Sequence, residues 1–307
     1  MTTPKMTGGD WGIILFLSLL WGGAFLMIAL GLRSFPPITL AFMRMALAVP
    51  FMLLALKYLG QRLPTDGRSW RKLFVLGGLN AAFPFMLFFW GQSYISTGLG
   101  SILNATTPLW GVVLAHLFTR DEKATPSRIL GVLLGLAGII VMVGTGALKG
   151  MTSDVLAQIA CLSATVLYAL AAIYGRTLSQ STMTPIVVAT GQVFTAAILI
   201  LPFMMVFDHP WTLPFPRWDA WIGAIGLAVP STAFAYFLYF RLIDRAGASN
   251  AMLVAFIMPV VAIFLGVVAL GESVSVKEML GATLIALGLV AIDGRLFAKL
   301  APRRSVP

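Results

Sequence analysis

Polar side chains recur at helical spacing inside the fourth long apolar segment of the chain. Ser101, Asn104, Pro108 and Gly111 follow one another at intervals of three and four residues, so they share one face of a helix. A buried amide or hydroxyl is costly unless it hydrogen-bonds to protein, water or a bound molecule. Proline also removes a backbone donor and frees a carbonyl about one turn earlier. This face therefore predicts hydrogen bonding to a small polar ligand beside a helix bend.

Two interpretations stay open for the hydroxyls of Thr106 and Thr107 in the same segment. They bond back to carbonyls of their own helix, or they line a path for a small molecule. For Asn104 the second interpretation is favoured, because an unused amide at the centre of an apolar segment is expensive.

Aromatic and polar side chains lie at mid-depth in several other apolar segments. An apolar, aromatic-walled pocket with a few placed polar groups is the usual form of a small-molecule site. The candidate binding residues are Trp21, Asn80, Phe83, Asn104, Gln158, Tyr168, Tyr236 and Tyr239. The candidate helix bends are at Pro84, Pro108, Pro230 and Pro259.

Arg44 is a cation about a third of the way into the second apolar segment. A charge at this depth must reach water, an interface or a partner. Two roles stay open: the guanidinium binds a substrate carboxylate, or it pairs structurally with backbone carbonyls. Its snorkelling to the interface requires the helix to start deeper than the sequence indicates.

The residues needed for catalysis are not gathered in one place. His116 and His209 are predicted near opposite membrane faces, and the single cysteine, Cys161, is expected to be an apolar filler. There is no phosphate-binding loop of the G-x-x-x-x-G-K-[ST] type. The sequence therefore predicts no enzyme, no metal and no cofactor. The acids all lie in loops or near segment ends: Asp10, Asp66, Asp121, Glu122, Asp154, Asp208, Asp219, Asp244, Glu272, Glu278 and Asp293.

The elements that position these residues are long apolar helices. Of the 307 residues, 59% are hydrophobic and only 10% are charged, which is too apolar for a water-soluble domain. An apolar run of about 20 residues spans a bilayer. The sequence predicts an all-α integral membrane protein with ten spans, at 11–32, 37–59, 70–91, 98–119, 127–146, 153–175, 184–206, 219–241, 248–270 and 277–297.

The basic residues predict the orientation of the chain. Sixteen of the 21 Lys and Arg residues fall on one side together with both termini, four fall on the other side, and Arg44 lies within a span. The positive-inside rule places both termini in the cytoplasm and the protein in the plasma membrane, the inner membrane in a bacterium. The net charge of +10 is thus a topology signal, and no nucleic-acid partner is expected.

The two halves of the chain repeat each other. Segment 83–90, FPFMLFFW, matches 234–241, FAYFLYFR, and Arg44 aligns with Gln192. Other matching pairs, at offsets of 148 to 151, are Pro37 and Pro185, Gly78 and Gly226, Pro108 and Pro259, and Glu122 and Glu272. Five spans per half is an odd number, so repeat 149–307 is inverted relative to repeat 1–148. Inverted repeats are a transporter architecture with the site at their interface.

Small residues form a face on the fifth and tenth spans. Gly131, Gly135 and Gly138 lie on one, and Gly281 and Gly288 on the other. Such faces allow close helix packing. Packing within the chain and a homodimer through these helices both remain open.

These features together resemble the drug/metabolite transporter superfamily, in its EamA-type branch. The resemblance rests on Trp21-Gly22-Gly23, on the mid-helix prolines 108 and 259, and on the turn glutamates 122 and 272. The aromatic third and eighth spans are most similar to the YddG-type exporters of aromatic amino acids and related metabolites. The resemblance implies a secondary transporter of small organic metabolites that works by alternating access without ATP. A channel-like pore and, less favoured, an intramembrane enzyme are the alternatives.

Overall fold

The computed structural model describes residues 6–119, 122–147, 152–179 and 183–293, and every regular element in these ranges is a helix. In the first half they are α1 (Gly8–Gly31), α2 (Pro37–Tyr58), α3 (Gly67–Gly77), η1 (Gly78–Ala82), α4 (Phe83–Gln92), α5 (Thr97–Asn104), α6 (Thr107–Phe118) and α7 (Pro126–Ala147). In the second half they are α8 (Ser153–Ser179), α9 (Pro185–Phe203), η2 (Met204–Asp208), η3 (Pro210–Thr212), α10 (Trp218–Ala228), η4 (Val229–Phe234), α11 (Ala235–Ala246), α12 (Ala248–Ala251), α13 (Leu253–Leu270) and α14 (Val276–Asp293).

All ten predicted spans are helical, which confirms the predicted fold class. Nine helical segments of the described chain are long and apolar enough to cross a membrane. The tenth, α14, has 18 residues and carries Lys277, Glu278 and Asp293 at its ends. The predicted last residues of that span, 294–297, lie outside the described residues.

Turn and capping chemistry sets where the helices begin. The Asp66 carboxylate accepts a hydrogen bond from the Ser69 amide at 2.8 Å and caps α3. That hydrogen bond lowers the pKa of Asp66 below its ordinary value. Proline occupies the first position of α2 and α9, where a missing backbone donor costs nothing. Local sequence therefore explains these boundaries without tertiary contacts.

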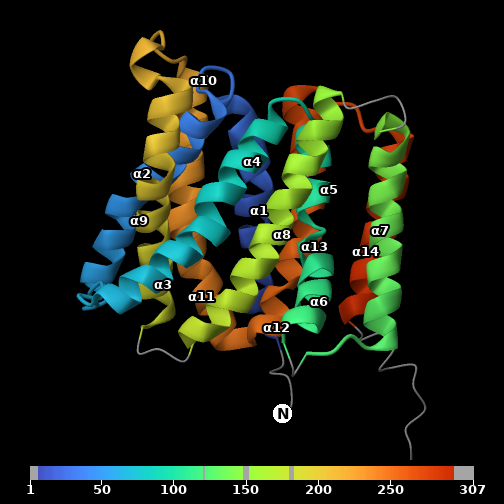
Figure 1. The fold of residues 1–307 in the computed structure, drawn as a ribbon, viewed down its shortest axis with the longest axis horizontal. Helices are drawn as coiled ribbons and strands as arrows, with labels where there is room; N and C mark the ends of the chain where they lie inside the picture. Colours follow the sequence, from blue (N-terminus) through green and yellow to red (C-terminus); the bar gives the residue numbers. More distant parts are fainter. Residues whose placement is uncertain (1–5, 120–121, 148–151, 180–182, 294–307) are drawn as a thin grey trace, which may run out of the picture.

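The two halves interleave as an inverted pair. α1 begins at the end of the molecule marked N, which we call the inner end, and α8 begins at the opposite, outer end (Figure 1). α1 packs against the ninth span (α13) and the eighth span (α10 and α11), and α8 packs against their counterparts, the fourth span (α5 and α6) and the third span (mainly α4). α2 packs against its repeat partner α9, and α7 against α14. The contacts thus come in pairs with the halves exchanged, as a two-fold relation requires.

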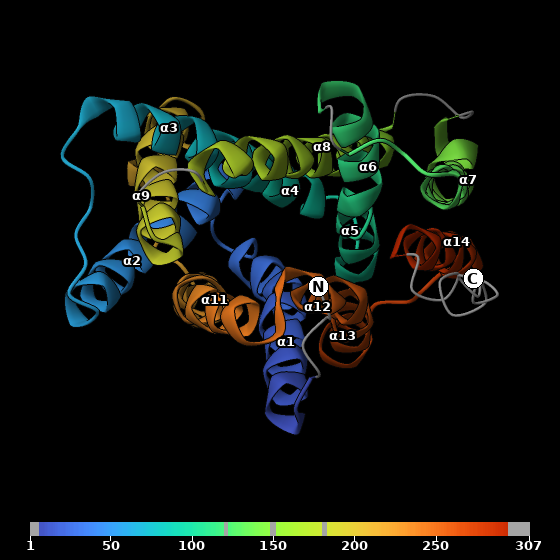
Figure 2. The same ribbon diagram turned by 90° about the horizontal axis from the view of Figure 1, so that it is seen from below.

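The pair α7 and α14 stands at one side of the bundle, and the two helices pack mainly against each other (Figures 1 and 2). A Cβ atom on Gly138 would lie 2.7 Å from the Gly281 carbonyl oxygen, and one on Gly131 would lie 2.5 Å from that of Gly288. The predicted glycine faces are therefore used within the chain. Their contact requires backbones to approach closely, which only glycine permits.

We expect Gly138→Leu to destabilise this helix pair by about 2 kcal/mol, because the added side chain forces the helices apart. The midpoint of thermal unfolding in detergent measures the effect. Gly12→Leu is the matched control, since a Cβ at Gly12 meets nothing within 4 Å. Equal midpoints for the two variants would contradict the glycine contact.

Candidate functional site

Helix irregularities occur where the polar candidates lie. The third and eighth spans each contain a π-helical segment, η1 and η4, which rearranges the backbone hydrogen bonds locally. Pro84 is in the first turn of α4, directly after η1, and Pro230 is in the first turn of η4.

The fourth and ninth spans break before their prolines, not at them. The fourth span breaks at Ala105 and Thr106, so Pro108 falls in the first turn of α6. A proline is tolerated there because its missing N–H has no intrahelical acceptor. In the ninth span the break is at Met252, and α13 continues through Pro259.

Arg44 is buried near the middle of the bundle, with 8% of its surface exposed. Its Nε donates to the Thr232 hydroxyl of η4 at 3.0 Å, and its guanidinium carbon lies 4.1 Å from the centre of the Phe85 ring. Tyr168 and Tyr236 lie within electrostatic range of the guanidinium. Arg44 therefore does not snorkel to an interface; it joins side chains from four spans.

Gln192 of α9 forms a second hydrogen-bonded pair, with Asn80. This pair and the pair of Arg44 and Thr232 are called the two couples below. Gln192 Oε1 accepts from Asn80 Nδ2 of η1 at 3.1 Å, and its Nε2 donates to the Tyr236 hydroxyl at 2.8 Å. The cluster of Arg44, Asn80, Gln192, Thr232, Tyr236 and Phe85 is called the central cluster below.

The inverted repeat relates the two couples to each other. Arg44 aligns with Gln192 and Phe85 with Tyr236, while Asn80 aligns within one residue of Thr232. Each couple joins the second helix of one repeat to the third helix of the other, and to its aromatic partner. The central cluster therefore lies at the repeat interface, where inverted-repeat transporters bind their substrates.

Aromatic rings flank the central cluster in two pairs that the repeat relates to each other. Trp21 and Tyr239 have ring centres 5.2 Å apart, and their counterparts Tyr168 and Phe88 have centres 6.4 Å apart. Trp21 Nε1 also donates to the Ser231 carbonyl at 3.1 Å. Four predicted residues, Trp21, Tyr168, Tyr236 and Tyr239, thus stand around the polar couples.

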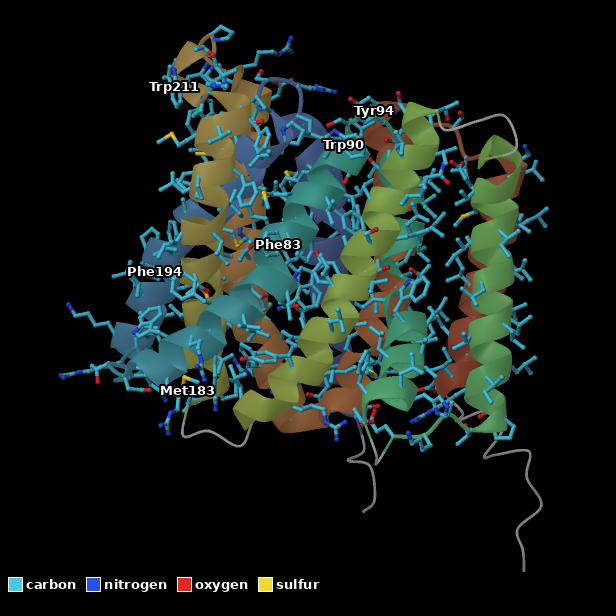
Figure 3. All side chains as sticks on the ribbon, viewed as in Figure 1. Phe83, Trp90, Tyr94, Met183, Phe194 and Trp211 are labelled. Atoms are coloured by element: carbon cyan, nitrogen blue, oxygen red, sulfur yellow. The ribbon has the colours of Figure 1, made fainter. Side chains whose placement is uncertain are left out.

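Phe83 and Gln158 lie apart from the central cluster. Phe83 is 39% exposed and packs its ring against Phe203 of α9 on the surface of the bundle (Figure 3). Gln158 is buried on α8, ten residues from Tyr168 and so about 15 Å further towards the outer end. Its Oε1 has no hydrogen-bond partner within the described part of the chain.

The hydroxyls of the fourth span bond back to their own backbone. Thr106 donates to the Leu103 carbonyl at 2.6 Å, and Thr107 to that of Asn104 at 2.8 Å. This is the first of the two interpretations left open by the sequence. Asn104 itself ends α5, and its side chain is partly buried beside the break.

A carboxylate caps a helix at the outer end of the bundle. Glu272, between α13 and α14, accepts from the backbone amides of Thr97 and Gly98 at 2.8 and 3.3 Å, which caps the start of α5. Gly266 makes room for this carboxylate, since a Cβ there would lie 2.4 Å from Glu272 Oε2. Its repeat counterpart, Glu122, instead pairs at 3.2 Å with Arg176 on the inner surface.

The burial of side chains differs between the outer and inner halves of the bundle around the central cluster. In the outer half Phe25, Phe88 and Gln92 are at most 7% exposed. In the inner half Tyr239 and Phe240 keep partial exposure, although their rings are in contact. Among these side chains, the ones in the outer half are therefore the more deeply buried. Trp90 and Tyr94 lie near the outer end, with ring centres 5.3 Å apart (Figure 3).

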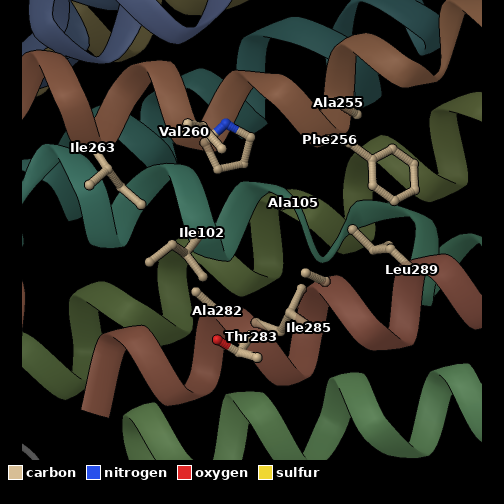
Figure 4. Close-up of a pocket in the computed structure, with 12 residues that line it drawn as sticks. Ile102, Ala105, Ala255, Phe256, Val260, Ile263, Ala282, Thr283, Ile285 and Leu289 are labelled. Atoms are coloured by element: carbon tan, nitrogen blue, oxygen red, sulfur yellow. The ribbon is translucent and has the colours of Figure 1, made fainter. Parts of the chain in front are cut away.

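A separate groove of about 250 Å³ lies between α5, α13 and α14 (Figure 4). Ile102, Pro259, Ile263 and Ile285 are among its apolar lining residues, and Thr283 is the polar one. With so few hydrogen-bonding groups, it suits a polar metabolite poorly. The central cluster is therefore the better candidate site.

Sequence reasoning missed Gln192 and Phe85 as site residues. Gln192 was visible as the repeat counterpart of Arg44, and Phe85 as that of Tyr236. Applying the repeat to every candidate would have found both, since each couple needs its symmetry-related partner.

The fold and this site define a multi-pass helical membrane protein, made of two inverted five-helix repeats that meet at a polar, aromatic-walled centre. Residues 10–144 and 155–292 each match the EamA-like transporter family, and the chain belongs to that family. It is accordingly a membrane transporter and not an enzyme. This confirms the resemblance at the level of the family.

The relatives cover nearly the whole chain. The uncharacterized transporter YoaV of Bacillus subtilis is 23% identical over 90% of this chain and 94% of its own length. The uncharacterized inner membrane transporter YedA of Escherichia coli is 26% identical over 93% and 92%, and Protein PecM of Dickeya dadantii is 26% identical over 91% of each. A solved crystal structure at 20% identity covers 98% of this chain and 100% of its own, with a TM-score of 0.66, which supports the fold.

Proposed function

We propose that this transporter exports small organic metabolites, either amino acids or aromatic and amphipathic compounds, by alternating access around the central cluster. The observation that carries the proposal is the pair of symmetry-related couples, Arg44 with Thr232 and Gln192 with Asn80, at the repeat interface. The finer likeness to YddG-type aromatic amino acid exporters is part of the same proposal. Its support is the ring of Trp21, Tyr168, Tyr236 and Tyr239.

The orientation of the chain in the membrane and its location are proposed from the charge pattern and the relatives. Basic residues at the inner ends favour cytoplasmic termini. YedA is named as an inner membrane protein, and we infer the same membrane for this chain in a bacterium. The deeper burial of the outer-half side chains and the partly exposed inner aromatics favour an inward-facing conformation.

We further propose that any homodimer uses the sides of α7 and α14 that point away from the bundle, and not their glycine faces. Leu133 and Ile140 of α7 and Leu287 of α14 are more than half exposed in the single chain. Lipid covers the same side chains in a monomer. Cross-linking through cysteines placed at position 133 separates the two arrangements, since only a dimer gives a cross-linked product.

The transport mechanism predicts saturable counterflow without ATP. Proteoliposomes preloaded with unlabelled substrate are expected to accumulate labelled substrate transiently, because carriers exchange bound molecules and open pores do not. No proton gradient is needed, since the sequence places no acid at mid-depth. Uptake of a screened amino acid with and without a pH gradient measures this. Loss of trans-stimulation would favour the pore, and strict dependence on the gradient would contradict uncoupled transport.

A further inference from the structure

The Arg44 guanidinium keeps hydrogen-bonding capacity that the protein does not use. Within the described part of the chain its one hydrogen bond uses Nε, donated to Thr232. The Phe85 ring covers one face of the guanidinium at 4.1 Å. Its two terminal amino groups thus hold four N–H donors for a ligand. Two parallel N–H donors in a plane are the geometry that fits a carboxylate.

No acidic side chain of the described chain forms an ion pair with Arg44. The described acids whose contacts are known act elsewhere, as helix caps or surface ion pairs: Asp10 with Arg245, Asp66 with Ser69, Glu122 with Arg176, Asp208 with Thr39, Asp219 with Arg33, Glu272 with Thr97, and Glu278 with Ser275. A buried cation without a counter-ion is costly in a membrane. An anionic substrate would supply the missing charge.

The charge count also limits the substrate. One guanidinium neutralises one negative charge, so a dianion would leave an uncompensated charge in the site. A zwitterion would also bring an ammonium group, and the carboxylates above are engaged at helix ends, so only hydroxyls and aromatic rings of the site would face that charge. A singly charged carboxylate therefore fits better than a phosphate or an amino acid.

From this we infer that the central cluster binds organic monocarboxylates, with the carboxylate on Arg44 and an aryl or apolar body against Tyr168 and Tyr236. This rests on the proposed transport function and narrows its substrate class. Each cycle then moves one negative charge outward while Arg44 stays in place. An inside-negative potential of about 100 mV favours that movement. At equilibrium it supports a carboxylate concentration about fiftyfold higher outside than inside. Export therefore needs neither ATP nor a coupled proton.

A matched series of ligands tests the charge assignment on the unaltered protein. 3-Phenylpropanoate, L-phenylalanine and 2-phenylethylamine share the same ring and carry a negative, zero and positive net charge. We expect thermal stabilisation by the carboxylate, weaker stabilisation by the zwitterion and none by the amine. A preference for the amine or the zwitterion would overturn the inference.

Arg44→Gln is expected to weaken 3-phenylpropanoate binding at least about tenfold, because it removes a charge-assisted pair of hydrogen bonds. Glutamine is what the repeat places at the equivalent position 192, so the fold should accept it. Arg44→Lys, which keeps the charge, should retain part of the binding. Equal binding by all three proteins would contradict the role of Arg44, and the ligand series decides the matter if Arg44→Gln fails to fold.

Currents on a solid-supported membrane measure the charge movement. A jump in 3-phenylpropanoate concentration at pH 8 should give a current of the sign of a moving anion, and Arg44→Gln should lose it. Leak of the neutral acid carries no charge and so does not interfere. Electroneutral counterflow of L-phenylalanine that survives in Arg44→Gln would overturn the anion assignment while leaving the transporter intact. Absence of counterflow with every screened metabolite would instead refute the proposed function.

Discussion

Glu272→Ala is expected to open the outer end of the transporter and to raise the labelling of an outer-half cysteine from outside by about thirtyfold. The substitution removes the charged acceptor of two hydrogen bonds that the Thr97 and Gly98 amides donate. Bonds to charged groups contribute about 1.5–3 kcal/mol each, and a shift of about 2 kcal/mol changes a population ratio about thirtyfold. The freed amides are hydrated only when α5 separates from α13.

The reporter for this experiment is Gly100→Cys in a Cys161→Ala background. A Cβ at Gly100 would lie 3.7 Å from Gln92 and from Phe25, so the position faces buried side chains of the outer half without steric conflict. Labelling with a membrane-impermeant maleimide gives the rate. Glu272→Gln should have a smaller effect, because its amide still accepts a hydrogen bond.

Glu122→Ala is the matched control for the outer gate. Glu122 is the repeat counterpart of Glu272, but it pairs with Arg176 at the inner surface, where both side chains are about half exposed. Its loss should leave labelling from outside unchanged. If Glu272→Ala behaves like Glu122→Ala in a folded protein, the carboxylate is a simple helix cap and not a gate.

The second large effect is expected when the link between Asn80 and Gln192 is removed. Asn80→Leu leaves Gln192 Oε1 without its donor, and Gln192→Leu leaves the Asn80 amide without its acceptor. Each loss costs about 1–3 kcal/mol of stability. The double variant replaces both partners with apolar groups, so its stability should recover towards that of the unaltered protein. Transport should not recover, because the polar groups that face the substrate are then missing.

We expect counterflow by the double variant to fall about a hundredfold, which corresponds to the loss of two hydrogen bonds to the substrate. Thermal unfolding and counterflow measured on the same preparations separate the two roles. Thr190→Val is the control, since among the described residues its buried hydroxyl bonds only to the Ile186 carbonyl of its own helix. Transport that recovers together with stability would show that the amide pair is structural.

Hydropathy and the internal repeat were enough to predict the class of the protein. Apolar runs of bilayer length predict membrane-spanning helices. In lipid, a helix satisfies all backbone hydrogen bonds within one segment. The matches between the halves and the odd number of spans predicted the inversion, and the contacts of α1 and α8 agree with it. The sequence also identified three of the six members of the central cluster, since Arg44, Asn80 and Tyr236 are polar or aromatic at a depth where such groups are rare.

Which of these residues contact one another could not be predicted before the helix packing was known. Helical spacing places Phe83 and Gln158 on plausible faces, but it does not say which neighbour each face meets. The structure puts Phe83 on the surface of the bundle. It buries Gln158 on α8, ten residues from Tyr168 and away from the cluster. It also joins Arg44 to Thr232 across 188 residues and Glu272 to Thr97 across 175. Such contacts depend on how ten helices pack around a two-fold axis. The order of residues along one helix does not predict that packing.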